Sequence, residues 1–600
     1  MCGFVGIWGS TDGLGDTRRI VSTLRHRGPD DRGEWSADHL WVGHCRLSVI
    51  DLSPRARQPM VTEQGTYALA FNGTIYNYKE LREELLDRGI TFKSESDTEV
   101  LLHTLITWGE AGLEKLRGMF AFAFYDTIKQ ELLLVVDRLG VKPLYFANVK
   151  DSWIFASELR AILSTDLVKP AVNQDALIEY LLTQTVAPPG TLINDVNCVP
   201  PGHLLRISPS GSELRCWWSL EGFSQQKTDI SRKAAISRLR ELLEESIRLR
   251  LIADVPVGAF LSGGIDSSTV VGLMSRVSTT PPRTFSVAFG EKFFDESRYS
   301  RSVASRFKTD HEEIQLTADY VLERLPEALN AFDHPSGDGV NTFMISQAVS
   351  EKGLKVALSG LGGDELFGGY PGFGRIRRLR RLKSFRPVIA PLLRTLSGKL
   401  HDLGNTPWEV IPLYHLTRQV WSPHDIRNMG FSDVDSRAES VDEVTADTMA
   451  FVSYLELTHY THDVLLRDTD QMSMAHGLEV RVPFLDPETV KFVLALPASL
   501  KSSPRTPKKL LVEAVSDLLP QEILRRPKQG FVLPFETWMK GPLTGFCEES
   551  LKVLEGIGGF DVGAVQNIWQ DFLKGGDPTW SRLWTLVALS RWAINIGAVG

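Results

Sequence analysis

The order of apolar and polar residues divides the chain into two parts. In the first part, short alternating runs predict antiparallel strands at residues 40–45, 67–71, 120–125, 132–137 and 153–156. Apolar residues with helical spacing predict helices at 78–88 and 97–108. In the second part, apolar runs at 255–261, 284–289, 311–316 and 354–358 alternate with helical segments at 232–250, 297–307, 320–332 and 343–352. Such alternation predicts a parallel sheet with helices on both faces.

The two parts are separated by a segment without periodicity. Serine and glycine are frequent between residues 208 and 229, and no apolar repeat persists there, which is typical of a domain junction. We therefore expect one domain at 1–207, a linker at 208–229 and a second domain at 230–600.

Composition narrows the class of protein. Of the 600 residues, 43% are hydrophobic and 23% charged, as in ordinary globular proteins, and the net charge of -8 gives no reason to expect a nucleic-acid partner. The five cysteines have the spacing of neither a disulfide framework nor a zinc site, which fits a reducing cytoplasm. No apolar segment reaches the roughly 18 residues that a membrane span needs. We expect a cytoplasmic protein that has neither nucleic acid nor membrane as a partner.

The segment AFLSGGIDSS, residues 259–268, follows an apolar run and leads into a helix through residue 277. Anions bind at such strand-to-helix turns, because glycines allow close backbone approach and the helix start offers unpaired N–H groups. Asp266 can hold a divalent cation that bridges phosphates. The pattern GxxxxGK[ST] is absent, so transfer of a γ-phosphoryl group is not expected. An ordinary glycine turn is the alternative, and the surrounding hydroxyls disfavour it: Ser262, Ser267 and Ser268.

The first residues, MCGFVGIWG, hold a second candidate site. Methionine before a small residue is normally removed, which would leave the thiol and the free α-amine on Cys2. An α-amine titrates at about 7.7–8.0 and can accept the thiol proton as a general base. On this residue alone, a buried structural cysteine is the alternative.

Two further segments contain candidate ligands for phosphate and metal. SGLGGDELFGGY, residues 359–370, contains five glycines and follows a buried strand, which suits a backbone that wraps closely around a ligand. Asp364 in this segment would complete a magnesium site opposite Asp266. In RPKQGF, residues 526–531, Lys528 could neutralise charge on a pyrophosphate, and a surface lysine is an equally good interpretation.

These motifs together resemble known families. MCGFVGI, LRHRGPDDRG, HCRLSVIDLS, AFNGTIYNYKELR, SDTEVLL and MFAFAFYD resemble the class II glutamine amidotransferase domain, an N-terminal-nucleophile (Ntn) hydrolase with an αββα sandwich. SGGIDSS resembles the pyrophosphate loop of the ATP-pyrophosphatases. The whole set, in this order, resembles the glutamine-hydrolysing asparagine synthetases. The resemblance implies an α+β domain, followed by a Rossmann-like α/β domain with a parallel sheet and a helical C-terminal part.

The resemblance also implies roles for residues at matching positions. Cys2 would attack the glutamine amide, Asn72 and Gly73 would form the oxyanion hole, and Lys528 would assist adenylation. Glutamine would be bound by Arg46, Leu47, Ser48, Val49, Ile50, Asn72, Gly73, Thr74 and Asp97. ATP would be bound by Leu261, Ser262, Gly263, Gly264, Asp266, Ser267, Ser268, Val287, Ser359 and Gly360. Mg²⁺ would be bound by Asp266 and Asp364.

Two positions depart from the family pattern. Thr74 stands where the motif NGEIYN has a glutamate, which predicts weaker glutamine binding, because losing a charge-assisted hydrogen bond costs about 1.5–3 kcal/mol. Leu361 stands where asparagine synthetases have an acidic residue, and a leucine cannot take a proton from a substrate ammonium. Leu361 thus mildly favours neutral ammonia over a bulkier amine as the nucleophile.

The expected function is an ATP-dependent amide synthesis fed by glutamine. Ammonia released at Cys2 would cross between the domains and attack an acyl-adenylate, with aspartate as the leading acid. Two alternatives remain: the same chemistry on another carboxylate, such as a secondary-metabolite or cell-envelope acid, and an inactive binding or storage homologue. The oligomeric state stays open, with a homodimer as one candidate.

Overall fold

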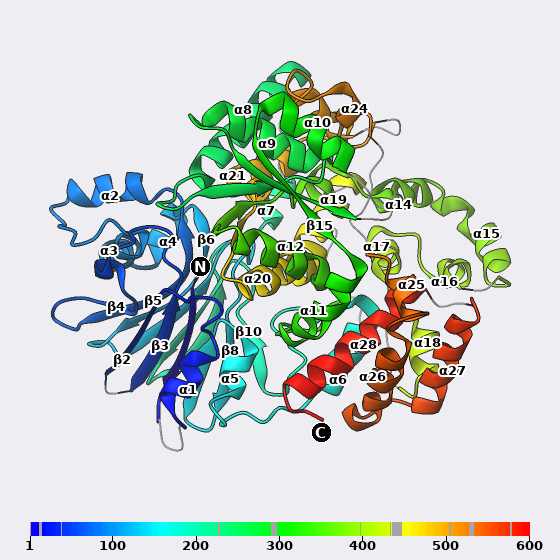
Figure 1. Ribbon diagram of the computed structural model, residues 1–600, viewed down its shortest axis with the longest axis horizontal. Coiled ribbons are helices and arrows are strands. Elements are labelled where there is room, and N and C mark those ends of the chain that lie inside the picture. The colour runs from blue at the N-terminus through cyan, green and yellow to red at the C-terminus, as the bar shows by residue number, and fades with distance from the viewer. Residues whose placement is uncertain are drawn as a thin grey trace.

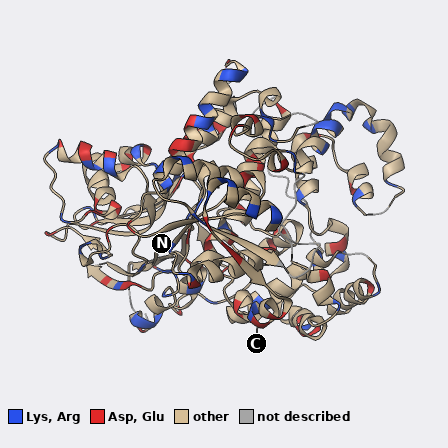
Figure 2. Cartoon of the chain, turned by 45° about the horizontal axis from the view of Figure 1, so that its top comes forward, with Lys and Arg blue, Asp and Glu red and all other residues tan. Residues whose placement is uncertain are grey.

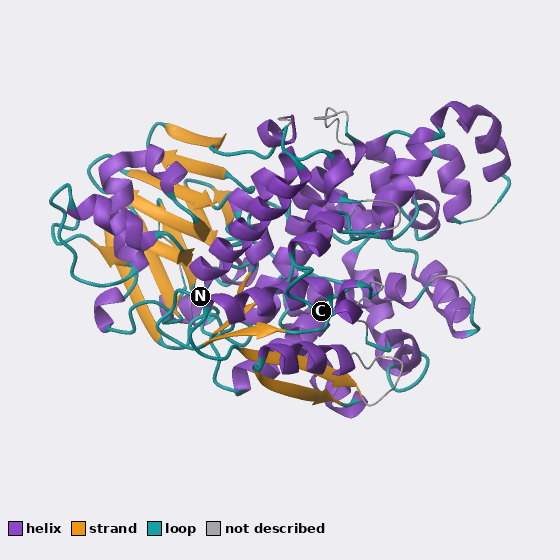
Figure 3. Ribbon diagram, turned by 90° about the horizontal axis from the view of Figure 1, so that it is seen from above, coloured by secondary structure: helices purple, strands orange, loops and turns teal. Residues whose placement is uncertain are grey.

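The computed structural model describes the chain except residues 1, 11–14, 38, 226–228, 290–296, 397, 433, 435–446, 503–505, 527–532, 577–578 and 600. Strands gather at one end of the molecule, and helices make up most of the remainder (Figures 1 and 3). The strand-rich end contains the N-terminal domain. The second domain holds a smaller sheet among its helices.

Two antiparallel six-stranded sheets face each other in the N-terminal domain. The first has the order β10-β8-β9-β1-β3-β2 and is formed by β1 (Gly3–Trp8), β2 (Asp31–Ala37), β3 (Leu40–Arg46), β8 (Tyr145–Val149), β9 (Ser152–Ala156) and β10 (Val196–Cys198). The second has the order β12-β11-β7-β6-β5-β4 and is formed by β4 (Met60–Val61), β5 (Tyr67–Ile75), β6 (Gly118–Asp126), β7 (Glu131–Val136), β11 (His203–Ser208) and β12 (Gly211–Cys216). Apolar side chains from both sheets form one buried cluster between them, including Phe4, Phe155, Tyr125 and Leu205.

Helices cover the outer faces of both sheets. α1 (Thr17–Ser22) and α5 (Leu159–Leu163) bury Ile20, Val21 and Ile162 in a cluster with Val5 and Ile7 of the first sheet. α2 (Tyr78–Leu86) and α3 (Asp97–Trp108) bury apolar side chains against Phe71 and Phe120 of the second sheet. The predicted αββα sandwich is therefore confirmed. The alternating pattern located five of its strands and both of its principal helices.

The N-terminal sheet extends beyond the boundary expected from the sequence. β12 pairs with β11 through residues 203–216, so its strand lies inside the segment assigned to the linker. The side chains of β12 are all exposed, which explains why no apolar repeat marks it. After α7 (Glu221–Gln225), the second domain begins with α8 (Arg232–Arg250).

A five-stranded parallel sheet with the order β15-β14-β13-β16-β17 forms the centre of the second domain. Its strands are β13 (Val257–Phe260), β14 (Arg283–Phe289), β15 (Asp310–Leu316), β16 (Val356–Leu358) and β17 (Glu479–Arg481). α9 (Ile265–Val277) and α10 (Ser297–Phe307) pack in a cluster with Ala259 and Leu358, while α12 (Gly339–Glu351) packs in a different cluster with Phe285 and Ala357. Helices thus cover both faces, as predicted. The sequence identified four strands and missed β17.

The rest of the second domain is helical. Its longer elements are α11 (Ala318–Asn330), α14 (Pro371–Arg381), α15 (Arg386–Leu393), α17 (Val410–Arg418), α19 (Thr448–Leu455), α20 (Arg467–Met474), α21 (Pro487–Ala495), α26 (Thr544–Ile557), α27 (Val562–Leu573) and α28 (Trp580–Asn595). A π-helix, η4 (Glu456–Leu466), joins α19 to α20. Within the described residues, no helix combines the length and apolarity that crossing a bilayer requires.

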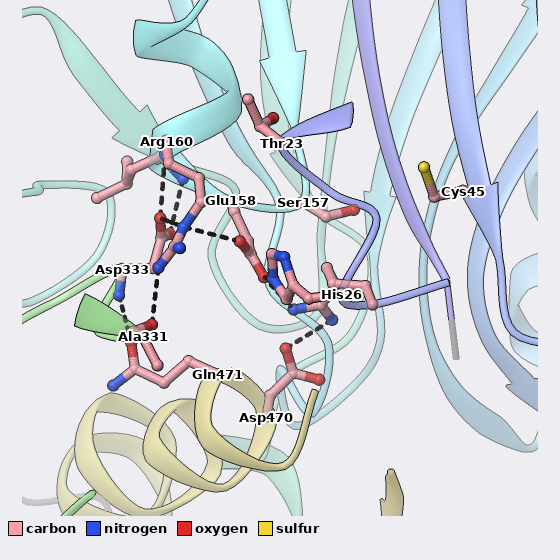
Figure 4. Close-up of polar contacts among 12 residues, drawn as sticks. Thr23, His26, Cys45, Ser157, Glu158, Arg160, Ala331, Asp333, Asp470 and Gln471 are labelled. Atoms are coloured by element: carbon pink, nitrogen blue, oxygen red, sulfur yellow. Dashed lines mark hydrogen bonds and ion pairs between the residues drawn. The ribbon is translucent and has the colours of Figure 1, made fainter. Parts of the chain in front are cut away.

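Buried ion pairs join the two domains. Asp470 of α20 accepts hydrogen bonds from Arg27 and Lys142, each at 2.8 Å, and all three side chains are buried. Burial alone would raise the pKa of Asp470, but the two positive charges lower it below its ordinary value. Glu158, Asp333 and Asp470 lie together at this boundary (Figure 4). Removing one partner of such a buried pair typically costs about 3–5 kcal/mol, so these contacts hold the domains in one relative position.

Candidate active sites

The first candidate site surrounds Cys2, which precedes β1 and is buried. Its backbone nitrogen donates to Oδ1 of Asn72 at 3.2 Å, and the backbone N–H of Leu47 lies against its sulfur. Burial raises the pKa of the Cys2 thiol, while the Leu47 N–H and the Arg46 charge oppose this shift. A thiol kept protonated by burial needs a base close by. The nitrogen of the same residue is such a base once it is a free amine.

Two candidate donors, the Asn72 side chain and the Gly73 N–H, lie on β5, and Asn72 contacts the Cys2 nitrogen. Asn72 is fully buried, and its Nδ2 has no hydrogen-bond partner. An unsatisfied buried amide of this kind is costly, unless a ligand oxygen takes the hydrogen bond. At Gly73, a Cβ would overlap the carbonyl oxygen of Met119, so only glycine fits there. The geometry suits an oxyanion hole made of the Asn72 amide and the Gly73 N–H.

The segment after β3 forms another wall of the site. The Arg46 guanidinium donates to the carbonyl oxygens of Ile50 at 3.2 Å and Ser53 at 3.3 Å, and also to that of Asp51. These bonds fix its orientation, and Leu47, Ser48, Val49 and Ile50 are buried beside it. The Ser48 N–H donates to Asp30, and the Asp254 N–H of the second domain donates to the carbonyl of Val49 at 2.9 Å. Both domains therefore support this segment.

Three acidic or hydroxyl side chains meet at the end of β5. Asp97, in the first turn of α3, accepts a hydrogen bond from the Ile75 N–H at 3.0 Å. Burial raises the pKa of Asp97 to about 7, and the charge of Glu479 contributes to this shift. The Thr74 hydroxyl donates to Oε1 of Glu479 at 3.2 Å. The structure therefore brings Thr74 and Asp97 together, as the resemblance implied, and adds Glu479 from the second domain.

Glu479 is a site residue that sequence reasoning missed. It lies on β17, is buried, and accepts a hydrogen bond from Nε of Arg481 at 2.6 Å. The charge of Glu479 also raises the pKa of Cys2, so the carboxylate faces the same site. The signal was present in the run EVRV, in which charged and apolar residues alternate as they do in a strand.

The second candidate site lies where β13 leads into α9. Gly263 has a φ of 71°, and a Cβ there would lie 2.5 Å from Cβ of Tyr299, so the turn requires glycine. The Ser262 and Ser267 hydroxyls are 3.1 Å apart, and the Gly264 N–H donates to Ser262 at 3.3 Å. Ser268 Oγ is buried without a partner. This concave turn at a helix start is suited to bind phosphate oxygens.

The glycine-rich segment 359–370 packs directly against this turn. A Cβ at Gly360 would lie 2.7 Å from the Ser267 nitrogen, and one at Gly363 would overlap Oδ1 of Asp266. The Ser359 N–H donates to the carbonyl of Arg481 at 2.8 Å. Leu261, directly after β13, and Val287, in β14, are both buried. The structure thus gathers the residues predicted to bind ATP at the carboxyl edge of the parallel sheet, where ligands bind in such folds.

Asp266 and Asp364 lie on either side of Lys508. The Lys508 ammonium contacts a carboxylate oxygen of each aspartate at 2.5 Å. Burial and the Asp364 charge raise the pKa of Asp266 to about 6, against the effect of Lys508. Burial alone would lower the pKa of Lys508, yet the two aspartates raise it, so the lysine stays charged.

This pair of carboxylates fits a divalent cation. Oδ1 of Asp266 is buried without a hydrogen-bond partner, and hard cations prefer carboxylate oxygens. Among the residues that the structure describes, no group of three or more His, Cys, Asp or Glu side chains could hold a metal ion. A magnesium ion here would therefore take its remaining ligands from phosphates and water, as Mg²⁺ commonly does.

The other charged residues near the second site, and Leu361, differ in how far the sequence predicted them. Lys528 lies in the segment 527–532, outside the described residues. Lys508 was not predicted, because RTPKKLLVEA carries no motif that distinguishes it from a surface lysine. Leu361 is partly buried, and its N–H donates to Ser359 Oγ at 3.3 Å. Glu365, in the same glycine-rich segment, is buried and accepts a hydrogen bond from the Tyr370 hydroxyl.

A small cavity of about 10 Å³, which has room for about one water molecule, lies between the two sites. It is lined by Tyr76, Gly118, Met119, Asp137, Arg138, Leu139, Val141, Arg250, Val482, Leu485 and Pro487. One wall reaches the first site, because Met119 pairs with Thr74 across β5 and β6. The opposite wall reaches the second site, because a Cβ at Gly362 would lie 2.7 Å from Leu485. The cavity is therefore bounded by neighbours of both sites.

Comparison with known proteins agrees with this two-site arrangement. Residues 1–218 match the glutamine amidotransferase domain family, and residues 238–594 match the asparagine synthase family. The chain is 30% identical to asparagine synthetase [glutamine-hydrolyzing] 1 of Bacillus subtilis, over 99% of this chain and 97% of that protein. It is 32% identical to a putative asparagine synthetase of Mycobacterium bovis, over 96% and 92%. It is also 28% identical to the amidase chry2 of Gibberella zeae, over 92% and 91%.

Proposed function

We propose that this chain, which belongs to the asparagine synthase family and is a glutamine-dependent ligase, forms asparagine from aspartate, with ATP as the activating substrate. The family supports the use of glutamine, ATP and a carboxylate. The choice of aspartate is the finer part of the proposal. The observation that supports an amide synthesis fed by glutamine is the small cavity lined by Met119 and Leu485, because neighbours of both candidate sites bound it.

Glutamine hydrolysis would require that Met1 has been removed from the mature protein. The free amine of Cys2 takes the thiol proton, and the sulfur attacks the amide carbon of glutamine. The oxyanion of the tetrahedral intermediate accepts hydrogen bonds from Asn72 Nδ2 and the Gly73 N–H. The C–N bond breaks, ammonia leaves with the proton that the amine returns, and water hydrolyses the thioester to glutamate and free Cys2.

The acid would be activated at the second site. Its carboxylate oxygen attacks the α-phosphorus of ATP, which gives the acyl-adenylate and pyrophosphate. The serines and N–H groups at the start of α9 bind the phosphates, while Lys508 neutralises charge on the pyrophosphate. Mg²⁺ held by Asp266 and Asp364 would supply further neutralisation of the phosphates. Ammonia then attacks the acyl carbon, and the amide and AMP are formed.

The direct test feeds the enzyme amide-¹⁵N glutamine, ATP and a panel of carboxylic acids. We expect ¹⁵N-asparagine together with AMP and pyrophosphate in equal amounts, and no amide without ATP. Cys2→Ala should abolish synthesis from glutamine and keep synthesis from added ammonia, because the second site is untouched. N-terminal sequencing should begin at Cys2. Release of ADP rather than AMP would contradict the proposed chemistry.

The second candidate function is the same chemistry on a different acid. Leu361 favours it, because an acidic residue that is typical of asparagine synthetases is absent there. In this case, the panel would give ATP–pyrophosphate exchange with an acid other than aspartate. Absence of exchange with every acid would instead favour a binding or storage protein.

A further inference from the structure

Three helices project from the second domain at the end opposite the N-terminal sheets (Figure 1). They are α14, α15 and α16 (Lys399–Asn405), and we call residues 371–405 the helical arm. α14 packs on α17 and α19, which belong to the body of the domain, whereas α15 packs mainly on α16 within the arm. One side of α15 is therefore left uncovered.

The uncovered side of the arm is apolar. Phe385, Val388 and Leu392 are 60%, 73% and 68% exposed. Phe385 directly precedes α15, and the spacing of three and four residues places it in one stripe with Val388 and Leu392. Leu382, Leu396 and Leu400 add to the exposed apolar surface of the arm. Of the ten large apolar side chains that are exposed in the described part of the chain, six lie in the arm. Single exposed apolar side chains are common on protein surfaces, but several that are grouped together indicate an interaction surface.

The arm is also strongly basic. It contains nine lysines and arginines and one acidic residue, Asp402, in a chain whose net charge is -8. Exposed basic residues precede and follow α15 in the chain, among them Arg378, Arg381, Arg394 and Lys399. In Figure 2, much of the ribbon of α14 has the colour of lysine and arginine, whereas most of the ribbon of α15 does not. An apolar stripe with basic flanks matches a surface that is itself apolar and anionic.

We propose that the helical arm binds an anionic membrane surface. The stripe of Phe385, Val388 and Leu392 enters the boundary between headgroups and acyl chains, and the flanking basic residues contact the lipid phosphates and carboxylates. The absence of a long apolar segment speaks only against a helix that spans the membrane. A helix that lies in the interface needs no such length.

Two other partners fit this surface less well. A symmetric dimer through the stripe would place the arginines of one copy against those of the other, which is repulsive. An acidic protein would match the charge, but it would need a groove for a helix that projects from the molecule. A lipid surface accepts a protruding stripe without a matching shape. The proposal does not depend on the activity of the enzyme.

The test measures sedimentation of the full-length protein with lipid vesicles. We expect binding to vesicles with about one third phosphatidylserine to be at least about tenfold stronger than to pure phosphatidylcholine, and to weaken as salt rises. The double variant Val388→Glu, Leu392→Glu should bind the anionic vesicles at least about tenfold more weakly. Ile128→Glu is the matched control, since Ile128 is 79% exposed but lies in the N-terminal domain.

A second variant tests the charges separately. Replacing Arg375, Arg378 and Arg381 with glutamine should remove most of the preference for anionic lipid and leave the thermal unfolding midpoint unchanged. The control has the same change of charge outside the helical arm. It replaces Arg18, Arg88 and Arg238 with glutamine, and we expect it to bind the anionic vesicles as the wild type does.

Several results would overturn the proposal. The proposal is wrong if the wild-type protein does not sediment with anionic vesicles. It is also wrong if the variant Val388→Glu, Leu392→Glu binds these vesicles as the wild type does. Concentration-dependent dimers that Val388→Glu dissolves would assign the stripe to self-association instead. A stoichiometric complex with an acidic protein, formed through the arm in the absence of lipid binding, would equally remove the membrane from the proposal.

Discussion

At the scale of single residues, the proposed role of Asn72 is to donate a hydrogen bond to the oxyanion. Its Nδ2 is buried without a partner, next to the Cys2 nitrogen. Removing one oxyanion donor typically costs about 2.7–4 kcal/mol, or about 10²–10³ in kcat. We expect Asn72→Ala to lower glutaminase kcat by that factor and to keep ammonia-dependent synthesis. Asn148→Ala, on the exposed part of β8, is the control and should leave both rates unchanged.

Thr74 and Glu479 give a second prediction at this scale. Thr74 alone predicts weak glutamine binding, but the structure places the Glu479 carboxylate 3.2 Å from its hydroxyl. We expect Glu479 to attract the glutamine ammonium in place of the missing glutamate, so Glu479→Gln should raise the glutamine KM about tenfold or more.

The reciprocal change tests whether the two positions share one role. Thr74→Glu should not lower KM in the wild type, because it adds a carboxylate beside Glu479 and Asp97 in a buried site. In the Glu479→Gln background, the same change should restore binding. Additive effects in this double-mutant cycle would show that the two residues act independently.

Asp97 adds a pH dependence. Because burial raises its pKa to about 7, this carboxylate is mostly protonated below that pH and carries no charge for the glutamine ammonium. The glutamine KM should therefore rise as pH falls from 7 to 6, while the KM for added ammonium salt, corrected to free ammonia, stays constant. Asp97→Asn should have a high KM that no longer changes over this range.

At the scale of elements, the sequence predicted the strands and helices that have a clear apolar pattern. The strands β13, β14, β15 and β16 of the parallel sheet and the helices between them follow apolar runs, and their bounds differ little from the expectation. β12 was missed because all its side chains are exposed, and β17 because the charged residues Glu479 and Arg481 interrupt the apolar run that marks the other buried strands. Lys508 could not be found, since its role depends on a tertiary contact with Asp266 and Asp364.

The glycine-rich segment gives a prediction for an element. A Cβ at Gly369 would overlap Oδ1 of Asp364 and displace Lys508. We expect Gly369→Ala to lower ATP–pyrophosphate exchange at least about tenfold, because a misplaced catalytic group loses about this much or more. Glutaminase activity should remain. Gly374→Ala, where no atom lies within 4 Å of the added carbon, is the control and should leave both activities intact.

At the scale of the whole molecule, buried ion pairs between the domains fix the position of the two sites relative to each other. Asp486 accepts hydrogen bonds from Arg117 at 2.9 and 3.1 Å and from Arg250 at 2.9 Å, and Asp470 binds Arg27 and Lys142. Each network joins the domains. Because Glu479 reaches the Cys2 site from β17, the second domain also completes the first site. The domains are therefore built to work in one relative position, which no local sequence pattern could have indicated.

The cavity between the sites provides the test of that arrangement. Val482 lines it, so a larger side chain at this position would fill the space between Met119 and Leu485. We expect Val482→Phe to keep both glutamine hydrolysis and ammonia-dependent synthesis, and to lower the yield of amide per glutamine hydrolysed several-fold. Overpacking by itself costs about 1–3 kcal/mol of stability. Val490→Phe, on α21, introduces a similar cost in the same domain without entering the cavity, and should leave the yield near that of the wild type. Equal yields in the two variants would mean that ammonia reaches the acyl-adenylate by another route.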